Sequence, residues 1–335
     1  MRRFRSTTYV LLVLALTPAA CGGGEDEEPA VESAGGFPVT IDHKFGKTEI
    51  PKRPERVVTV GYTEQDTVLA LGVKPLGERE FLGGYDYAKR PWAQTALGGA
   101  KPEPVGQEEV NFERVASLRP DVLIGVNSGM SARDYKTLSK IAPTVPQTDE
   151  FIDFGVPWQV QAAMVGQALG LEDRAKEVVR ETEAKFATIR KAHPEFEGKT
   201  AALAYGSGGG KFGAYSSQDY RTRFFEDLGF KAPKAVDKLA GKSFYVDFSK
   251  EQVRLMDQDV LIMFASEKTV AGDPLYKRLD AVKEGRVIYL DLADQLAGAL
   301  GFGSPLSLSY AAEGFAPPLE QALDGDPATN VEQPR

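Results

Sequence analysis

The stretch "NFERVASLRPDVLI" at residues 111–124 decides how this chain is read, because "SKEQVRLMDQDVLI" at residues 249–262 repeats it. Six of the fourteen aligned positions are identical: Glu113 and Glu251, Val115 and Val253, and the Asp-Val-Leu-Ile run at 121–124 and 259–262. Valine, leucine and isoleucine occur in any buried strand. The glutamate, however, recurs eight residues before the aspartate, where no packing rule requires a carboxylate. We therefore interpret the chain as two related units.

The repeat extends beyond the strand. "YKTL" at 135–138 precedes "APTVPQTD", just as "YKRL" at 276–279 precedes "GRVIYLD", so each unit reads helix, strand, helix, strand. Earlier in the first unit, "RVVTV" at 56–60 is a β-branched run ending in glycine, followed by the helical "TEQDTVLALG". "KTAALAYG" and "DYRTRFFEDLGF" repeat this order in the second unit. Strands alternating with helices predict two similar α/β lobes.

A long helix is expected between the two units. It runs from 172 to 193, where Pro194 stops it, and its apolar residues form one narrow stripe. A helix that is polar around most of its circumference is typical of a bridge between domains. We predict an N-terminal lobe at 37–155, a helical connector at 156–196, a C-terminal lobe at 197–326 and a disordered tail at 327–335. Residues 80–103 are expected to form a long surface loop.

The N-terminus indicates export. Three arginines precede an apolar run at 9–20 that is too short to span a membrane, so 1–20 is interpreted as a signal peptide. Cys21 is the single cysteine and resembles the lipid-attachment site of bacterial lipoproteins, although Pro18 stands where that family has leucine. Residues 21–36 are expected to be a flexible acidic tether. The predicted location is extracytoplasmic and lipid-anchored; the alternative is a soluble exported protein with an unmodified cysteine.

Composition excludes several functions. With 48 acidic and 40 basic residues, a nucleic-acid-binding surface is not indicated. The sequence has no Gly-x-Ser-x-Gly, no Cys-His pair and no phosphate loop, so no enzyme is predicted. "GSGGGKFG" at 206–213 has the wrong spacing for a phosphate loop and is interpreted as a strand-to-loop transition. His43 and His193 are the only histidines, too few for a zinc or manganese site or for histidine ligation of haem, although a tyrosine could still bind haem.

The mature chain resembles the substrate-binding proteins of bacterial ATP-binding cassette importers for ferric siderophores, haem and cobalamin. The resemblance rests on "IPKRPERVVTV", "VGQEEVNFERVASLRPDVLIG", "YKTLSKIAPTV", "GQALGLEDRA", "FEDLGF" and "SPLSLSYA". It implies the type III periplasmic-binding-protein fold, in which two lobes flank a shallow cleft and one long helix joins them, and it implies a monomer. It also implies that Glu113 and Glu251 dock onto arginines of two permease subunits. Alternatively, both glutamates only favour a helix dipole.

The expected ligand is a ferric siderophore, with iron present only as part of that ligand and no other cofactor. Haem or a corrinoid is the alternative within binding, and an exported enzyme or adhesion module is the alternative outside it. Such chelates are recognised by aromatic walls and by cationic side chains. Because ligands of open α/β sheets lie beyond the carboxyl ends of strands, the predicted binding residues are Tyr62, Arg79, Phe81, Trp92, Tyr215, Arg221 and Tyr245.

Overall fold

The structure, a computed structural model, describes residues 36–81, 86–207 and 209–334. The expected signal peptide, Cys21 and residues 21–35 of the tether lie outside these ranges. None of the helices in the described ranges combines the length with the apolar character that a membrane span requires.

The N-terminal lobe is built on a five-stranded sheet in the order β5-β4-β3-β6-β7, with every pair parallel. An antiparallel hairpin of two strands precedes it. The predicted loop at 80–103 contains three short helical segments. In chain order the elements are β1 (Val39–His43), β2 (Gly46–Ile50), β3 (Val57–Thr59), α1 (Glu64–Ala70), β4 (Gly77–Glu78), η1 (Tyr87–Lys89), η2 (Pro91–Ala93), α2 (Gln94–Leu97), β5 (Glu103–Pro104), α3 (Phe112–Ser117), β6 (Val122–Gly125), α4 (Ala132–Leu138) and β7 (Thr144–Pro146).

The C-terminal lobe has a second five-stranded sheet, in the order β10-β9-β8-β11-β12. Strands β8, β11 and β12 are parallel, whereas β9 runs antiparallel to β8 and to β10. The glycine-rich stretch at 206–213 includes the last residue of β8 and the first two residues of β9. The elements are η3 (Pro194–Phe196), β8 (Ala201–Gly206), β9 (Phe212–Tyr215), α7 (Tyr220–Asp227), α8 (Lys234–Ala240), β10 (Tyr245–Asp247), η4 (Val253–Met256), β11 (Val260–Phe264), α9 (Glu267–Val270), η5 (Tyr276–Arg278), α10 (Asp280–Lys283), β12 (Val287–Tyr289), α11 (Gln295–Phe302) and α12 (Pro305–Ala322).

The sequence repeat occupies equivalent places in the two sheets. Strand β6 pairs with β3 and β7, as β11 pairs with β8 and β12. The repeated aspartate binds the start of the neighbouring strand in each lobe: the Asp121 carboxylate accepts the N–H groups of Glu55 and Arg56, and Asp259 accepts the N–H of Thr200 at 2.7 Å. The expected second helix is different, since only the 3₁₀ segment η4 follows Glu251.

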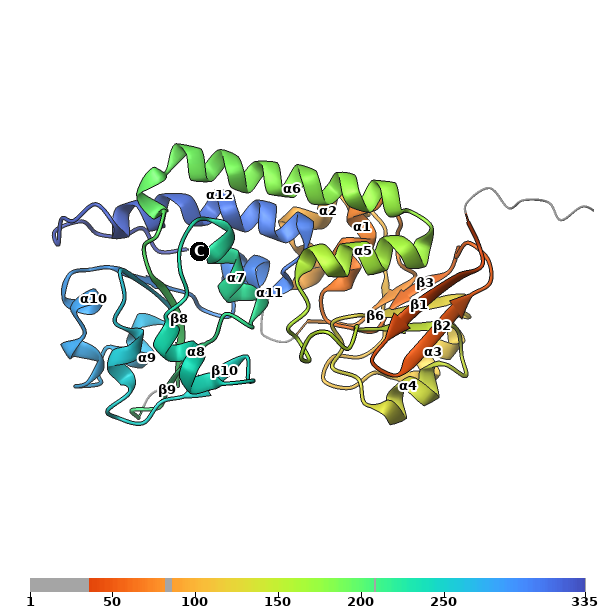
Figure 1. Cartoon of the computed structure of the whole chain (residues 1–335), viewed down its shortest axis with the longest axis horizontal. Helices are drawn as coiled ribbons and strands as arrows, with labels where there is room; N and C mark the ends of the chain where they lie inside the picture. Colours follow the sequence, from red (N-terminus) through yellow and green to blue (C-terminus); the bar gives the residue numbers. More distant parts are fainter. Residues whose placement is uncertain (1–35, 82–85, 208, 335) are drawn as a thin grey trace, which may run out of the picture. The chain divides into compact units, whose positions relative to one another are not determined.

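Two helices, α5 (Trp158–Leu169) and α6 (Glu172–Ala192), connect the lobes. Helix α6 ends before Pro194, as predicted, and buries one stripe formed by Ala175, Val178, Thr182 and Phe186. It packs on α5 and on α12, and Figure 1 shows α6 and α12 side by side. Helix α12 begins at a Ser304 and Ser307 capping box. The sequence analysis did not predict this helix, because Pro317 and Pro318 lie inside it.

The C-terminal tail differs from the expected disordered segment as far as residue 334. Val331 is buried, with 4% of its surface exposed. The Gln333 side chain donates to the carbonyl of Val287 and accepts the N–H of Tyr289, so it binds the edge strand β12. These bonds give the tail a partner that its polar composition did not reveal.

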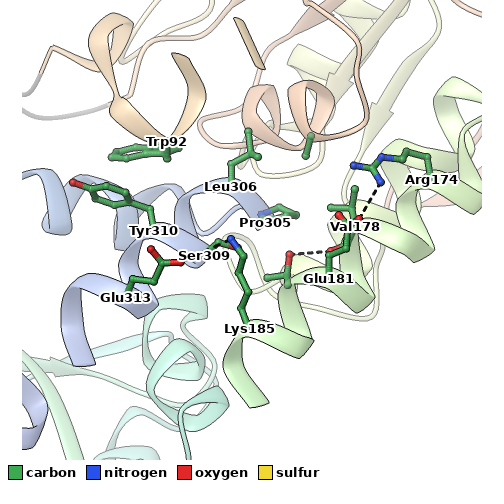
Figure 2. Close-up of a pocket in the computed structure, with 12 residues that line it drawn as sticks. Trp92, Arg174, Val178, Glu181, Lys185, Pro305, Leu306, Ser309, Tyr310 and Glu313 are labelled. Carbon is green, nitrogen blue, oxygen red and sulfur yellow. Dashed lines mark hydrogen bonds and ion pairs between the residues drawn. The ribbon is translucent and has the colours of Figure 1, made fainter. Parts of the chain in front are cut away.

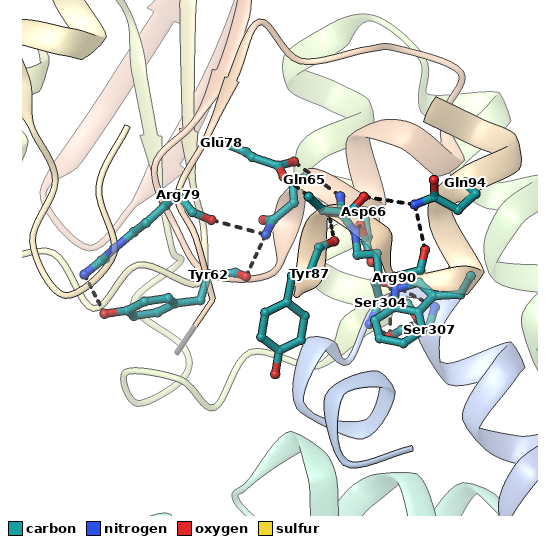
Figure 3. A network of polar contacts seen from close by, with 12 residues as sticks. Tyr62, Gln65, Asp66, Glu78, Arg79, Tyr87, Arg90, Gln94, Ser304 and Ser307 are labelled. Atoms are coloured by element: carbon teal, nitrogen blue, oxygen red, sulfur yellow. Dashed lines mark hydrogen bonds and ion pairs between the residues drawn. The ribbon is translucent and has the colours of Figure 1, made fainter. Parts of the chain in front are cut away.

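A buried ion pair lies at the first turn of α1 (Figure 3). The Arg90 Nε donates to Asp66 Oδ1 at 2.7 Å, and the two side chains are 1% and 0% exposed. Trp92 Nε1 donates to the other carboxylate oxygen at 2.6 Å, and Arg90 also bonds both oxygens of Glu78. Burial raises the pKa of Asp66, while Arg90, Trp92 and a hydrogen bond from Ser304 oppose the rise. Because Ser304 caps α12, this network joins the N-terminal lobe to the last helix.

We predict that Arg90→Ala destabilises the protein by about 3 to 5 kcal/mol, because it leaves the Asp66 carboxylate buried without its cation. The matched control is Arg174→Ala on α6, where the pair with Glu177 is exposed at 39% and 50% and contributes at most about 1 kcal/mol. Urea denaturation followed by circular dichroism measures both. Similar losses in the two variants would contradict a special role for the buried pair.

Candidate functional site

Four aromatic side chains lie together on one face of the C-terminal sheet. Strand pairing sets Tyr205 beside Phe264 and Tyr215 beside Tyr245. Because side chains two residues apart on a strand share a face, the pairing of Tyr205 with Gly213 puts all four on the same side. The ring centroids of Tyr205 and Tyr215 are 5.3 Å apart, and those of Tyr215 and Phe264 are 6.2 Å apart. We call these residues the C-lobe aromatic group.

Gly213 allows one member of this group to reach across a strand. The Tyr205 hydroxyl donates to Asp247 Oδ1 at 2.7 Å, over the backbone of β9. A Cβ atom at Gly213 would lie 2.2 Å from the Tyr205 ring, so only glycine fits there. Burial, with this bond to Asp247, raises the pKa of Tyr205 and keeps its hydroxyl protonated.

Arg221 borders the C-lobe aromatic group from the start of α7. Its guanidinium carbon lies 3.9 Å from the centre of the Tyr215 ring, a cation–π distance. Its Nε and Nη2 donate to the two oxygens of Asp219 at 2.9 and 2.7 Å. The Asp219 side chain is 1% exposed and that of Arg221 18%. Burial opposes the charge of Arg221, but Asp219 holds its pKa well above the ordinary value.

Tyr62 and Arg79 form the corresponding part of the N-terminal lobe, just after β3 and β4. The Arg79 guanidinium lies 3.8 Å from the centre of the Tyr62 ring and donates to its hydroxyl at 2.6 Å (Figure 3). Arg79 is only 6% exposed, because it also donates to the carbonyls of Gln107, Glu108 and Ser128. Burial lowers its pKa. Arg79 therefore links Tyr62, which follows β3, to the backbone at residues 107–108 and 128.

Aromatic contacts connect Tyr62 with the other lobe. The centre of its ring lies 6.2 Å from the ring centre of Phe81 and 6.3 Å from that of Phe154. Phe154 has a left-handed backbone, with φ of 63°, and its ring is 6.2 Å from Phe244, the neighbour of Tyr245. A left-handed backbone is unusual for a phenylalanine and often marks a functional position. We call Tyr62, Phe81 and Phe154 the N-lobe aromatic group.

Two hollows are relevant to the location of a ligand. One, of about 450 Å³, adjoins Arg79 at the carboxyl ends of β3, β4 and β6, and is also lined by Glu108, Glu109, Arg133 and Asp134. The other, of about 310 Å³, lies between α6 and α12 (Figure 2). Its charged residues pair with one another, as Arg174 does with Glu181. We place the candidate site at the aromatic groups, because most of their residues lie at strand ends and Phe154 contacts Phe244, the neighbour of Tyr245.

Trp92 was predicted to bind ligand from a long surface loop, but the structure places it in the core, and its role as a ligand contact stays a prediction. Its side chain is 9% exposed, packs on Phe302 and Tyr310, and donates its N–H to the buried Asp66. The residue follows Arg90 and Pro91 into a short helical segment, so it lies in the core rather than in a surface loop.

Five residues of the candidate site were not predicted from the sequence: Tyr205, Phe264, Phe154, Asp219 and Asp247. Tyr205 and Phe264 could have been found, because they are the last large side chains of two strands that the pattern predicted. Phe154 gives no local signal, since its place depends on the backbone of the connector. The other predicted residues, Tyr62, Arg79, Phe81, Tyr215, Arg221 and Tyr245, remain predictions as ligand contacts.

Glu64 is a buried acid below Tyr62. Its side chain is fully buried and accepts the N–H of Thr63 at 3.2 Å. Gly61 makes room for it, because a Cβ there would lie 2.1 Å from a Glu64 oxygen. Burial raises the pKa of Glu64 from its ordinary 4.5 to about 7, although hydrogen bonds from backbone N–H groups and the nearby Arg79 oppose the rise.

Neither histidine lies among the candidate site residues. His43 is 5% exposed, bonds Thr48 at 2.9 Å, and has its pKa lowered by burial. His193 lies beside Glu195 and Glu320, with one possible ligand atom of each within 4.8 Å of the others. The two carboxylates are largely exposed, and His193 already bonds Glu195 at 3.0 Å. This cluster is a surface contact among the residue after α6, η3 and α12.

The repeated glutamates are both exposed. Glu113 lies in the first turn of α3, after the cap residue Asn111, so its carboxylate favours the helix dipole. Glu251 lies in a turn before the short η4, where hydrogen bonds from its own N–H and from Ser249 lower its pKa. The helix-dipole interpretation therefore suits Glu113 but not Glu251.

The two sheets joined by the connecting helices α5 and α6 are the architecture of a two-lobed solute-binding protein. Residues 57–293 match the periplasmic binding protein family, and the chain belongs to it. It is 28% identical to the probable siderophore-binding lipoprotein YfiY of Bacillus subtilis, over 87% of this chain and 91% of that protein.

Solved structures agree with this assignment. A periplasmic solute binding protein from Mycobacterium smegmatis is 34% identical, with a TM-score of 0.74 over 85% of this chain and 98% of that chain. Streptococcus pneumoniae PiaA in complex with ferrichrome is 28% identical, with a TM-score of 0.77 over 86% of this chain and 99% of that chain. The predicted type III fold is confirmed.

We predict that Glu64→Gln changes how stability depends on pH. Because the folded pKa of about 7 lies above the ordinary 4.5, the contribution of Glu64 is fully present below about pH 4.5 and is lost as the pH rises through 7. Between pH 5 and pH 8 the wild type should lose up to about 3 kcal/mol relative to the variant. Urea titrations at both values measure the difference, and a difference independent of pH would contradict the buried ionisation.

Proposed function

We propose that this protein is the extracytoplasmic solute-binding component of an ATP-binding cassette importer, and that it binds a ferric siderophore without catalysing a reaction. The observation that carries the proposal is the pair of aromatic groups, each with an arginine within 3.9 Å of a tyrosine ring centre. Aromatic faces and rigid donors suit a bulky chelate whose iron is already fully coordinated. The description of YfiY as a probable siderophore-binding lipoprotein and the complex of PiaA with ferrichrome support this class of ligand.

The proposed ligand position is between Tyr62, Phe81 and the C-lobe aromatic group. Tyr215 and Tyr245 are presented from neighbouring strands, and Tyr245 is 42% exposed. A large exposed aromatic next to three others is a ready contact for a ligand. We further propose lipid attachment at Cys21, which the relative's description as a lipoprotein supports.

We expect Tyr215→Ala to weaken binding of ferrichrome at least about tenfold, because the chelate loses a stacking surface. The matched control is Tyr310→Ala, in the hollow between α6 and α12, which should leave the affinity unchanged. Quenching of intrinsic fluorescence during titration measures both, with haemin and cobalamin as comparison ligands. Weaker binding only in the Tyr310 variant would contradict the proposed position and indicate the hollow between α6 and α12. Tighter binding of haemin than of ferrichrome would contradict a siderophore as the ligand.

We also propose that Glu113 and Glu251 contact two permease subunits. They occupy equivalent positions in the two lobes. Glu113 precedes β6, which pairs with β3, and Glu251 precedes β11, which pairs with β8. Among the described residues neither glutamate has an ion-pair partner within 4.0 Å. Two related, uncommitted charges suit a partner with two related subunits.

The test separates binding from transport. Glu113→Lys combined with Glu251→Lys should bind ferrichrome normally but abolish most uptake by cells, because like charges would then oppose each other across the interface. Each single alanine variant should reduce uptake less than the double one. The control, Glu172→Lys with Glu183→Lys on the exposed side of α6, makes the same charge change elsewhere. Normal uptake by the first variant at native expression would refute docking.

A further inference from the structure

Resting on the proposed function, we infer that the site selects a ferric chelate that carries no net negative charge. The chemical class is an uncharged or cationic ferric tris-hydroxamate, and the excluded class is a trianionic ferric tris-catecholate. The inference rests on what the two arginines already bind. An anionic ligand needs cations that are free to meet its charge, because desolvating an unpaired anion is costly.

Arg221 is neutralised within the protein. Both oxygens of Asp219 accept from it, in the parallel geometry that gives the strongest carboxylate pairing. The carboxylate is 1% exposed, so water does not weaken the pair and a ligand cannot displace the aspartate. What Arg221 presents beside Tyr215 is therefore a guanidinium whose charge is balanced less than 3 Å away.

Arg79 is also committed. Its Nε, Nη1 and Nη2 all donate to protein acceptors, three of them backbone carbonyls, and the Tyr62 ring covers one face. At 6% exposure it cannot rotate toward a ligand without leaving those carbonyls unpaired. The hollow beside it carries three acids, Glu108, Glu109 and Asp134, against one further base, Arg133.

Two further charged residues near the aromatic groups do not favour an anion. Asp247 is exposed beside the Tyr205 hydroxyl and adds negative charge. Arg223 of α7 donates to the carbonyls of Ser217 and Gly155 and is directed into the protein. The named residues set four arginines against five carboxylates, so the charge that they place around the aromatic faces and hydroxyl groups is close to zero. Those features match the uncharged periphery of a tris-hydroxamate chelate.

The experiment compares ferrichrome, which is uncharged, with a trianionic ferric tris-catecholate, by fluorescence titration of the full mature chain. We expect ferrichrome to bind at least a hundredfold more tightly, with an affinity that stays the same between low and high salt. Equal or tighter binding of the tris-catecholate would overturn the inference but leave the proposed function intact. Failure of both chelates to bind would overturn the proposed function, and the inference with it.

A variant tests the cause. Asp219→Asn removes the balancing charge but keeps a side-chain oxygen for the Arg221 N–H at the start of α7. In this variant the ratio of the affinity for ferrichrome to the affinity for the tris-catecholate should fall at least tenfold, because the tris-catecholate binds more tightly. Asp237→Asn is the control, since Asp237 accepts the N–H of Ser217 and does not contact Arg221. An unchanged preference in a folded Asp219 variant would overturn the role of the pair, and the wild-type comparison decides the inference if that variant does not fold.

Discussion

The ion pair between Arg90 and Asp66 is the constraint on which the arrangement of this protein depends. Two charges at 1% and 0% exposure are tolerable only if every oxygen and N–H that they bury finds a partner. Glu78, Trp92 and the capping Ser304 supply those partners from three other segments. The chain before β5 and the start of α12 must therefore meet in one geometry. An apolar side chain could change its rotamer at little cost, whereas this network cannot shift without leaving a buried charge unpaired.

The first turn of α1 carries that constraint to the ligand site. Asp66 holds the core network, while the adjacent Gln65 donates to the carbonyls of Tyr62 and Arg79 (Figure 3). Glu64, one residue earlier, lies below the same loop. Three consecutive polar side chains thus fix the position of Tyr62 relative to α12. This turn holds Tyr62 in place, which suits a site that binds a preformed, rigid chelate and loses little conformational freedom on binding.

The same turn shows where prediction from the sequence succeeds and where it fails. The strands, the helices closed by Gly72 and Gly170 and the long helix α6 follow local patterns of apolar spacing and chain breakers, so they were predictable. Residues 64–66 read as the solvent-exposed start of a helix, yet all three are buried, because segments distant in the sequence cover them, such as Arg90 on Asp66 and Asn127 on Glu64. Trp92 was misplaced for the same reason. Tyr62 and Tyr215 were proposed because strand ends are a local signal, and as ligand contacts they stay predictions. The pair of Arg221 with Asp219 is also local, two residues apart, but the burial of Asp219 depends on the fold.

The repeat that began the sequence analysis separates structural from external constraint. Its aspartates, Asp121 and Asp259, each bind the backbone at the start of a neighbouring strand, so the architecture alone accounts for them in both lobes. Among the described residues, Glu113 and Glu251 make no comparable bond to a neighbouring strand. A helix dipole accounts for Glu113, but Glu251 lies in a turn before a 3₁₀ segment, and the local structures of the two have diverged. Glu113 and Glu251 are thus the same residue in two different local structures, which is what the proposed contact with two related permease subunits would require.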